Sequence, residues 1–401
     1  MAYSVPDPYR QAIRGSIKWW ASVDATLGGA PVAGATGMRP TGGSITDTSR
    51  PGVRRTLRLE LASSPGLFDA LSPIGTELVV TVHVEYQNRT VVDIPMGVFD
   101  VDSETVSESG GGISLTAPDK WVRIKRAQFL QPVGSTPGIT VVEQIVVLLQ
   151  SALGGETVNV TATHPARIGS MVWERDREKA INDLAAEIGA WVYFDRDGVA
   201  TVADVPYTGG SANWMVDAGA GGVLIDVDRE RSRTETCNIV VVESSASEGA
   251  LFPTMYVWDA NPSSPTYAGP GSGSGEAPPA LGTSGPFGLV PYFHDSPTLA
   301  SAGMAVLTGQ SLLARQVGLA SQISLTQVPN WAMDAFDALD VLPNTARRTV
   351  IEGVAASGVP ILNRISSGAV LERHIADTVT HPLTHGSGQQ IQGRSTGGGF
   401  A

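Results

Sequence analysis

Three histidines near the end of the chain have the side chains best suited to bind a metal. They are His374, His381 and His385. Pro382 follows His381 directly, and the residue before a proline avoids helical geometry, which disfavours a helix carrying two ligands on one face. The sequence therefore favours exposed or hydrogen-bonded histidines over metal ligands.

Three aspartates, Asp93, Asp100 and Asp102, are candidates for the acid and base of a glycosidase, whose mechanism uses two carboxyl groups. Asp100 and Asp102 are two residues apart, so on a strand they share a face, and solvent must separate their like charges. We interpret all three as solvated residues at strand edges.

An acidic turn, "DRDG", could be mistaken for part of a calcium loop. If Gly198 took loop position six, Tyr193 would be at position one and Asp204 at position twelve. The first carboxylate and the bidentate glutamate would both be missing. The turn is therefore predicted to be solvated, without metal at Asp195 or Asp197.

Motifs for other chemistry are also lacking. No Gly-Lys pair of a phosphate-binding loop occurs, "GAGGVL" at 219–224 lacks the third glycine of a dinucleotide turn, and the serines of "GSGSG" at 271–275 are out of register for a hydrolase. The single cysteine, Cys237, is expected to be a small buried group. The sequence thus identifies no catalytic, cofactor-binding or metal-binding residue, and we expect neither an enzyme nor a cofactor.

The first part of the chain has the pattern of successive strands. In "RRTLRLELA", Leu57, Leu59 and Leu61 alternate with Arg58 and Glu60, which is the period of a half-buried strand. We interpret the two basic clusters, 54–58 and 123–126, as solvated strand faces.

The spacing of apolar residues and the capping residues predict three helices. Residues 139–153 place apolar side chains on one helical face. Asp176 is the expected cap of a second helix, which Gly189 ends before a hairpin of "AWVYF" and "VATVADV" that turns at Gly198. Ser296 and the proline after it are expected to start a third helix, which closes at Gly318.

Charge and hydropathy exclude two kinds of partner. The chain has 401 residues and a formal net charge of −12, so duplex DNA would be repelled rather than gripped. The most apolar window, 139–153, contains Glu143 and is too short to span a bilayer, and "MAYSVPDPYR" lacks the apolar core of a signal peptide. We expect no membrane insertion.

Two segments have the composition of flexible chain. Residues 261–288 are rich in Gly, Pro and Ser and are expected to form a mobile surface loop or linker. Residues 387–401 are expected to be a flexible C-terminal tail.

The order of these elements resembles the tail hub proteins of long-tailed bacteriophages, which are related to the hubs of contractile tails. The resemblance covers roughly residues 40 to 395. The segments that carry it, in chain order, are "GSITDTSRPGVRRTLRLEL", "PMGVFDVDSETVSESGGGISLTAPDKWVRIKRAQF", "AINDLAAEIGAWVYFDRDGVATV", "NIVVV", "ASAGMAVLTGQSLLARQVG", "ALDVL" and "ERHIADTVTHPLT".

This resemblance implies a β-rich α+β fold with two tube-like β-barrel domains and a small α+β insert domain. The first barrel is expected at 1–128, the insert at 129–206, and the second barrel, with a packed helix and the 261–288 loop, at 207–386.

The resemblance also implies the function of a structural hub at the distal end of the phage tail. A homotrimer would form a ring that caps the tail tube, docks on a distal tail protein and surrounds the channel of the tape measure protein. DNA would later pass this channel without specific binding, and other faces would anchor tip, fibre or receptor-binding proteins.

Two alternatives remain from the sequence. A distal tail protein or another minor tail protein would be a binding module, and distal tail proteins form rings of six. A tail enzyme that degrades the cell wall is the other alternative, although no motif supports it.

Overall fold

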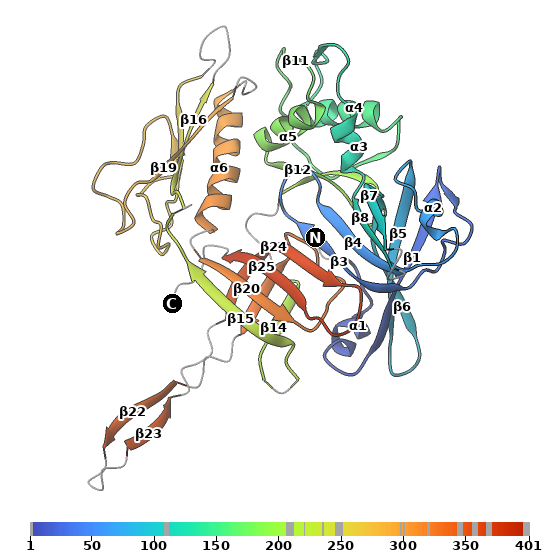
Figure 1. Ribbon diagram of the computed structural model, residues 1–401. Helices are drawn as coiled ribbons and strands as arrows, with labels where there is room; N and C mark the ends of the chain where they lie inside the picture. Colours follow the sequence, from blue (N-terminus) through green and yellow to red (C-terminus); the bar gives the residue numbers. More distant parts are fainter. Residues whose placement is uncertain are drawn as a thin grey trace.

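A computed structural model describes most of the chain. Its described residues are 3–107, 112–205, 212–219, 221–234, 236–244, 252–296, 299, 301–318, 321–342, 348–354, 360–365 and 371–395. The predicted β-rich architecture is confirmed: sheets dominate, and helices pack against them (Figure 1). Within this part of the chain, none of the helices combines the length and apolar composition needed to cross a bilayer.

The N-terminal region contributes an antiparallel sheet of four strands. The order of its strands is β2 (Ala30–Pro31), β1 (Lys18–Leu27), β5 (Thr76–Glu85) and β6 (Val91–Asp100). Two short helices, α1 (Asp7–Ala12) and α2 (Leu67–Ala70), flank it. Alternate residues of β1 and β5 are buried, as the period-two pattern requires.

A ten-stranded sheet joins the N-terminal and C-terminal halves of the chain. Its main path runs β15 (Leu224–Arg231), β20 (Ser321–Gln327), β25 (Gln389–Ser395), β24 (Glu372–Pro382), β3 (Pro40–Thr48), β4 (Arg55–Ala62), β8 (Gly112–Pro118) and β7 (Ser103–Val106). Off this path, β21 (Ala338–Leu342) pairs with β24, and β14 (Trp214–Asp217) pairs with β21. Within the described residues this sheet ends in edge strands and does not close into a barrel.

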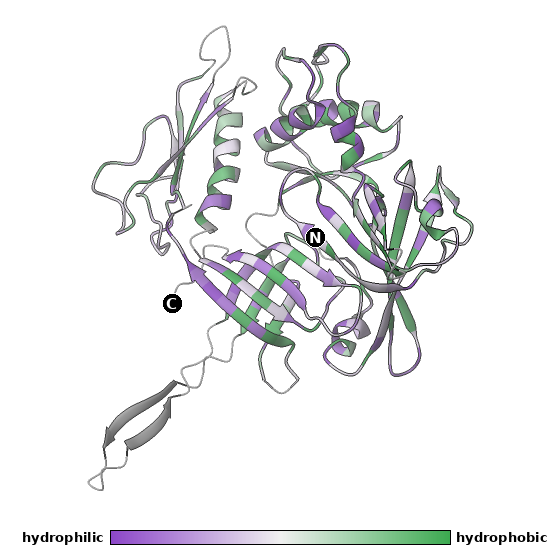
Figure 2. Ribbon diagram, viewed as in Figure 1, coloured by the Kyte–Doolittle hydropathy of each residue, from purple (hydrophilic) through white to green (hydrophobic). Residues whose placement is uncertain are grey.

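The main core lies against these two sheets. Leu57, Leu59 and Leu61 are buried as predicted, and polar and apolar residues alternate along the strands (Figure 2). The antiparallel contact between β3 and β24 makes the two halves of the chain share this core.

Two hairpins repeat each other on either side of that contact. The hairpins β3–β4 and β24–β25 have connections of equal length, 49–54 and 383–388. Ile45 pairs with Leu57 in the first, and Val379 pairs with Ile391 in the second, at the same distances from the strand ends. All four side chains are fully buried. Strands β8 and β7 continue the sheet on one side, and β20 and β15 continue it on the other, so the arrangement has a local two-fold character.

The predicted helix and hairpin occur in the sequence between the first β region, which contains β1 to β8, and the second β region, which contains β14 to β25. The helix is α5 (Arg177–Glu187), and the hairpin is β12 (Ala190–Phe194) with β13 (Ala200–Asp204). Asp176 caps α5 by accepting a hydrogen bond from the Lys179 amide at 2.8 Å. Gly198 has a φ of 74°, which gives the turn its left-handed residue.

Further short elements complete this helix-and-hairpin unit. Helix α4 (Val141–Ala152) confirms the predicted amphipathic helix and begins with a capping box, in which Thr140 and Glu143 bond each other's backbone amides. The other elements of the unit are β9 (Val133–Gly134), β10 (Val158–Val160) and β11 (Val172–Trp173), and helix α3 (Trp121–Arg126) directly precedes it in the sequence.

A further layer, the β16–α6 layer, lies in the sequence between the neighbouring strands β15 and β20. Its strands are β16 (Ile239–Ser244), β17 (Met255–Trp258), β18 (Ser274–Gly275) and β19 (Pro291–Ser296), and its helix is α6 (Ala302–Gly318). The helix packs tightly: a Cβ added at Gly309 would lie 2.5 Å from Val257 Cγ2. A separate hairpin is formed by β22 (Arg348–Val354) and β23 (Pro360–Ile365).

The start predicted for the third helix is wrong. Ser296 ends strand β19, where it pairs with Ser244, and α6 begins only at Ala302. Pairing with β16 thus overrides the local capping signal. The residue after Ser296, the proline of that signal, lies outside the described part of the chain, whereas the predicted end of the helix at Gly318 is confirmed.

The two segments expected to be flexible contain fixed structure. In residues 261–288, the carbonyl oxygens of Thr266 and Gly288 accept bonds of 2.8 and 2.7 Å from Asn238 Nδ2, and Ala268 is fully buried. In the expected tail, Gln389–Ser395 forms β25 between β20 and β24. The expectation of a flexible tail was wrong for residues 389–395, because strands β20 and β24 pair with their backbone; residues 396–401 lie outside the described part. Residues 261–288 form the predicted loop apart from the two-residue strand β18, and the bonds from Asn238 hold this loop in place.

Candidate functional site

A cluster of buried charged side chains lies where the two β regions and the helix-and-hairpin unit meet. We call it the junction network, and its members are Asp47, Arg54, Arg55, Arg196 and Asp334. Each side chain is at most 7% exposed.

Two arginines at the start of β4 connect β3 with the second β region. Arg54 donates to both carboxylate oxygens of Asp47, at 2.7 and 3.1 Å. Arg55 Nη2 donates to Asp334 Oδ1 at 3.0 Å and lies 3.4 Å from Asp47 Oδ2. The interpretation of Arg54 and Arg55 as part of a solvated face was wrong, although Arg58 is exposed.

The turn between β12 and β13 contributes the third arginine. Arg196 Nη2 donates to Asp334 Oδ1 at 2.8 Å and to the Met333 carbonyl at 2.9 Å. Arg196 Nη1 donates to the Pro95 carbonyl of β6 at 3.0 Å. The turn expected to be merely solvated is therefore a docking element, while Asp197 is exposed and Asp195 accepts bonds from backbone amides of its own turn.

The charges of this network depend on one another. Burial alone would raise the pKa of Asp334, but Arg196, Arg55 and Arg54 hold this pKa well below its ordinary value. Asp119 lies beside the network and accepts bonds from the Arg54 and Arg55 amides. Burial raises the pKa of Asp119 to about 6, against these bonds.

This arrangement can fix the relative geometry of the segments that it joins. Removal of one member of a buried ion pair leaves its partner uncompensated, whereas the intact pair adds little net stability. Because Arg196 contacts β6, Met333 and Asp334 together, the network favours one relative position of the three parts of the chain.

The three histidines each lie beside a different neighbouring side chain. Within the described residues, no group of three or more His, Cys, Asp or Glu side chains is arranged to hold a metal ion. His381 is fully buried and accepts a bond from Gln389 Nε2 at 3.0 Å, and burial lowers its pKa to about 3. His374 Nε2 lies 3.5 Å from Glu372, and the ring of His385 lies 4.4 Å from that of Trp19.

Each of the three candidate aspartates lies beside a basic side chain. Asp93 lies 2.6 Å from His83 Nδ1, and Asp102 lies 2.7 Å from Arg126. Asp100 accepts a bond of 2.8 Å from Arg123 Nε and is only 15% exposed, so its interpretation as a solvated edge was wrong. The second basic cluster, residues 123–126, belongs to helix α3, so its interpretation as a solvated strand face was wrong.

Comparisons with known proteins give a match by structure. No family model and no curated protein sequence matches the chain. A tail protein from Neisseria meningitidis MC58 has a TM-score of 0.60 at 11% identity, covering 94% of this chain and 97% of that chain. The 43 kDa tail protein of prophage MuSo2 from Shewanella oneidensis has a TM-score of 0.52 at 13% identity, with coverages of 93% and 98%.

A third solved structure agrees. Prophage tail protein gp18 from Listeria monocytogenes EGD-e has a TM-score of 0.52 at 8% identity, with coverages of 94% and 95%. The chain has the fold of phage tail proteins. The resemblance predicted from the order of its segments is thereby confirmed at the level of the fold.

The residues at the centre of this phage tail protein fold were missed by the sequence analysis, although a signal was present. Arg55 has the same parity as Leu57, Leu59 and Leu61, so the alternation of β4 places it on the buried face. A buried arginine requires an acidic partner, and Asp47 follows Ile45 on the buried face of β3 by the same rule. Nothing local points to Arg196 or Asp334.

Proposed function

We propose that this protein is a structural hub of a phage tail tip and has no catalytic activity. The observation that carries the proposal is the repeat of hairpins β3–β4 and β24–β25 within a fold shared with phage tail proteins. A subunit with two equivalent β regions can supply two positions of a six-fold-like ring, so three copies would match a hexameric tail tube.

The two β regions would act as the tube-like domains. We assign the first to 1–128, the helix-and-hairpin unit to 129–206, and the second to the rest of the chain through Ser395, with the β16–α6 layer as its addition. Within the described residues β7 and β15 are the outermost strands of the ten-stranded sheet, which supports closure between subunits, because an edge strand is a site for adding further strands.

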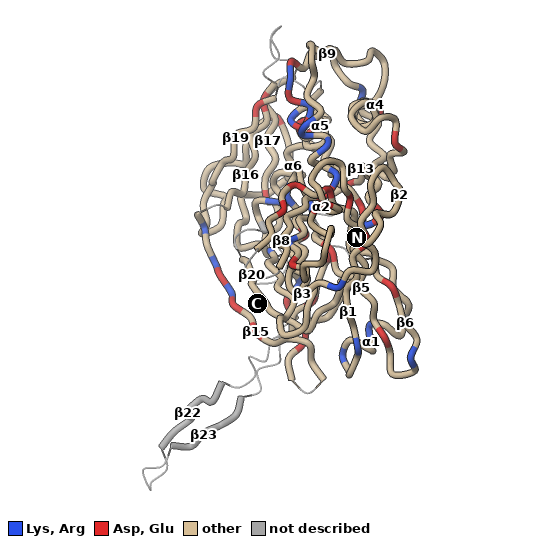
Figure 3. The backbone as a smooth tube through the Cα atoms, turned by 45° about the vertical axis from the view of Figure 1, so that its right-hand side comes forward, with Lys and Arg blue, Asp and Glu red and all other residues tan. Residues whose placement is uncertain are grey.

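The partners follow from the position of such a ring. We propose a homotrimer that docks on a distal tail protein, surrounds the tape measure protein and carries tip, fibre or receptor-binding proteins. The net charge of −12 favours DNA that slides through the ring without specific binding. Edge strand β15 carries charged residues of both signs along its length, which suits a hydrated contact (Figure 3).

The number of copies per virion tests this proposal. Quantitative mass spectrometry of purified particles, calibrated against the tail tube protein, is expected to give three copies. Six copies would favour a distal tail protein instead. Incubation of the purified chain with isolated cell wall is expected to release no soluble fragments, and their release would support the alternative of a wall-degrading enzyme.

A further inference from the structure

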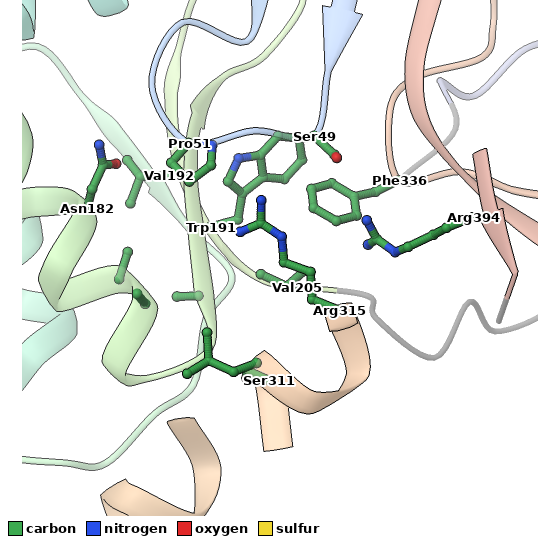
Figure 4. Close-up of a pocket in the computed structure, with 14 residues that line it drawn as sticks. Ser49, Pro51, Asn182, Trp191, Val192, Val205, Ser311, Arg315, Phe336 and Arg394 are labelled. Atoms are coloured by element: carbon green, nitrogen blue, oxygen red, sulfur yellow. The ribbon is translucent and has the colours of Figure 1, made fainter. Parts of the chain in front are cut away.

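A cavity of about 80 Å³ lies beside the junction network, where α5, α6, β12 and β25 approach one another (Figure 4). Its lining includes the aromatic rings of Trp191 and Phe336, the side chains of Arg315 and Arg394, and Ser49 of the connection between β3 and β4. A single water needs roughly 10–15 Å³ of such space, so the cavity has room for several waters or one polyatomic ion.

Arg394 gives this cavity a buried and incompletely paired cation. Its side chain is 5% exposed, and Nη1 pairs with Asp377. Nη2 is buried and has no hydrogen-bond partner among the described residues. Because a buried unpaired donor is costly, and more so on a charged group, a ligand oxygen at this nitrogen would be favourable.

Arg315 supplies a second cation from a different element. It lies in the last turn of α6, is exposed, and has no hydrogen-bond or ion-pair partner in the described part of the chain. Figure 4 shows its side chain and that of Arg394 reaching into the space beside Trp191 and Phe336.

The local charge is opposite to that of the whole protein. Two guanidinium groups of the cavity face one nearby carboxylate, Asp377, which also accepts a bond of 3.0 Å from Ser49 Oγ. The guanidinium of Arg54 lies 4.6 Å from the centre of the Trp191 ring, which lines the cavity. A positive cavity in a chain of net charge −12 selects an anion.

We propose that this cavity binds an inorganic oxyanion of the size of phosphate, held by Arg394 Nη2 and the guanidinium of Arg315. Planar guanidinium groups suit the oxygens of such an ion. The bound ion connects β25 to α6 beside the connection after β3, and so attaches the β16–α6 layer to the ten-stranded sheet.

Isothermal titration calorimetry with inorganic phosphate, at constant ionic strength in NaCl, tests this site in the full chain. The wild type is expected to bind one phosphate, and Arg315→Gln is expected to weaken binding at least tenfold because it removes one of two cations. The matched control is Arg58→Gln, an exposed arginine on β4, which is expected to leave the affinity unchanged. Circular dichroism verifies that each variant is folded.

Three results would overturn the proposal. They are the absence of phosphate binding in the wild type, equal affinity in Arg315→Gln and wild type, which would indicate an adventitious ion only, and tighter binding of acetate than of phosphate, which would indicate a carboxylate site. Arg394→Lys keeps a charge near Asp377 but loses the Nη2 position, and it is also expected to weaken binding tenfold or more. The site lies within one chain, so a negative result leaves the hub proposal unaffected.

Discussion

The two repeated hairpins share one backbone arrangement, but a buried polar pair is ionic in the first hairpin and neutral in the second. In the first, Asp47 on β3 lies 3.4 Å from Arg55, the first residue of β4. At the equivalent positions of the second, His381 on β24 bonds to Gln389, the first residue of β25, at 3.0 Å. One pair is ionic and the other is neutral, although all four side chains are buried.

This difference reflects what each hairpin must hold. The ionic pair reaches outward through Asp334 and Arg196 to other parts of the chain. The neutral pair continues into local amide contacts, in which Gln389 bonds to Gln327 at 2.6 Å and to the Asn330 carbonyl at 3.0 Å. In these two hairpins, the buried charges reach the helix-and-hairpin unit through Arg196, whereas the direct partners of the neutral pair, Gln327 and Asn330, lie in the second β region.

The largest expected effect follows from making the first hairpin resemble the second. Arg55→Gln leaves Asp47 and Asp334 with one fewer cation in a buried site, and we expect a loss of about 3–5 kcal/mol in the free energy of unfolding. Chemical denaturation measures this loss. Arg58→Gln, on the exposed face of the same strand, is the control and is expected to change stability by less than about 0.5 kcal/mol. A loss below about 1 kcal/mol for Arg55→Gln would contradict the role of the network.

The apolar pairs test whether the hairpins are equivalent in packing. Leu57→Ala and Ile391→Ala each remove a fully buried side chain from the matching position of β4 or β25. Each is expected to cost about 2–5 kcal/mol, with the two losses within about 1 kcal/mol of each other. Equilibrium denaturation of both variants gives the comparison, and a difference above about 2 kcal/mol would show that the two sites are not equivalent.

Because His381 is neutral and buried in the second hairpin, the folded protein is expected to lose stability in acid. Burial lowers the pKa of His381 to about 3 from an ordinary 6.5. Between these values the unfolded chain binds the proton that the folded chain excludes, so the stability contribution is complete above pH 6.5 and is lost as the pH falls toward 3.

His381→Gln should remove this loss. The slope of unfolding free energy against pH, measured by denaturation between pH 6 and about 4, is expected to be smaller in the variant by up to about 1.4 kcal/mol per pH unit. Identical slopes in variant and wild type would mean that the buried ring is protonated in the folded state or that its proton is balanced elsewhere.

The smallest effects are expected at exposed ion pairs, one in each region. Lys18 pairs with Glu85 in the first region and Arg229 with Glu372 in the second, both at 3.0 Å. Lys18→Ala and Arg229→Ala are each expected to cost at most about 1 kcal/mol, less in high salt. A thermal unfolding series against NaCl measures both. A loss above about 2 kcal/mol at either site would contradict the expectation that an exposed ion pair contributes little to stability.

Local signals predicted some of these elements well. The Asp176 cap and the turn at Gly198 define α5 and its hairpin, because caps and left-handed turns depend on neighbouring residues alone. Strand β25 was missed because "QQIQGRS" becomes a strand by pairing with β20 and β24. Strand β20 is distant in the sequence, and the local residues do not show the register of the pairing with β24.

The candidate site was predictable in part. The alternation of β4 places Arg55 inside, but its partner Asp334 lies 279 residues away, and no local pattern connects them. The same limit applies to Arg315 and Arg394, which line one cavity only because α6 and β25 both border it. Sequence spacing can thus show that a charge is buried without showing what neutralises it.

A three-dimensional reconstruction of an intact virion's tail tip, obtained by electron cryomicroscopy, would show directly whether this protein forms a trimeric hub. Three copies are expected around the channel, with hairpins β3–β4 and β24–β25 alternating at similar radius to give six β positions in the ring. Six copies in one layer, or a ring to which only one of the two hairpins contributes, would contradict this expectation.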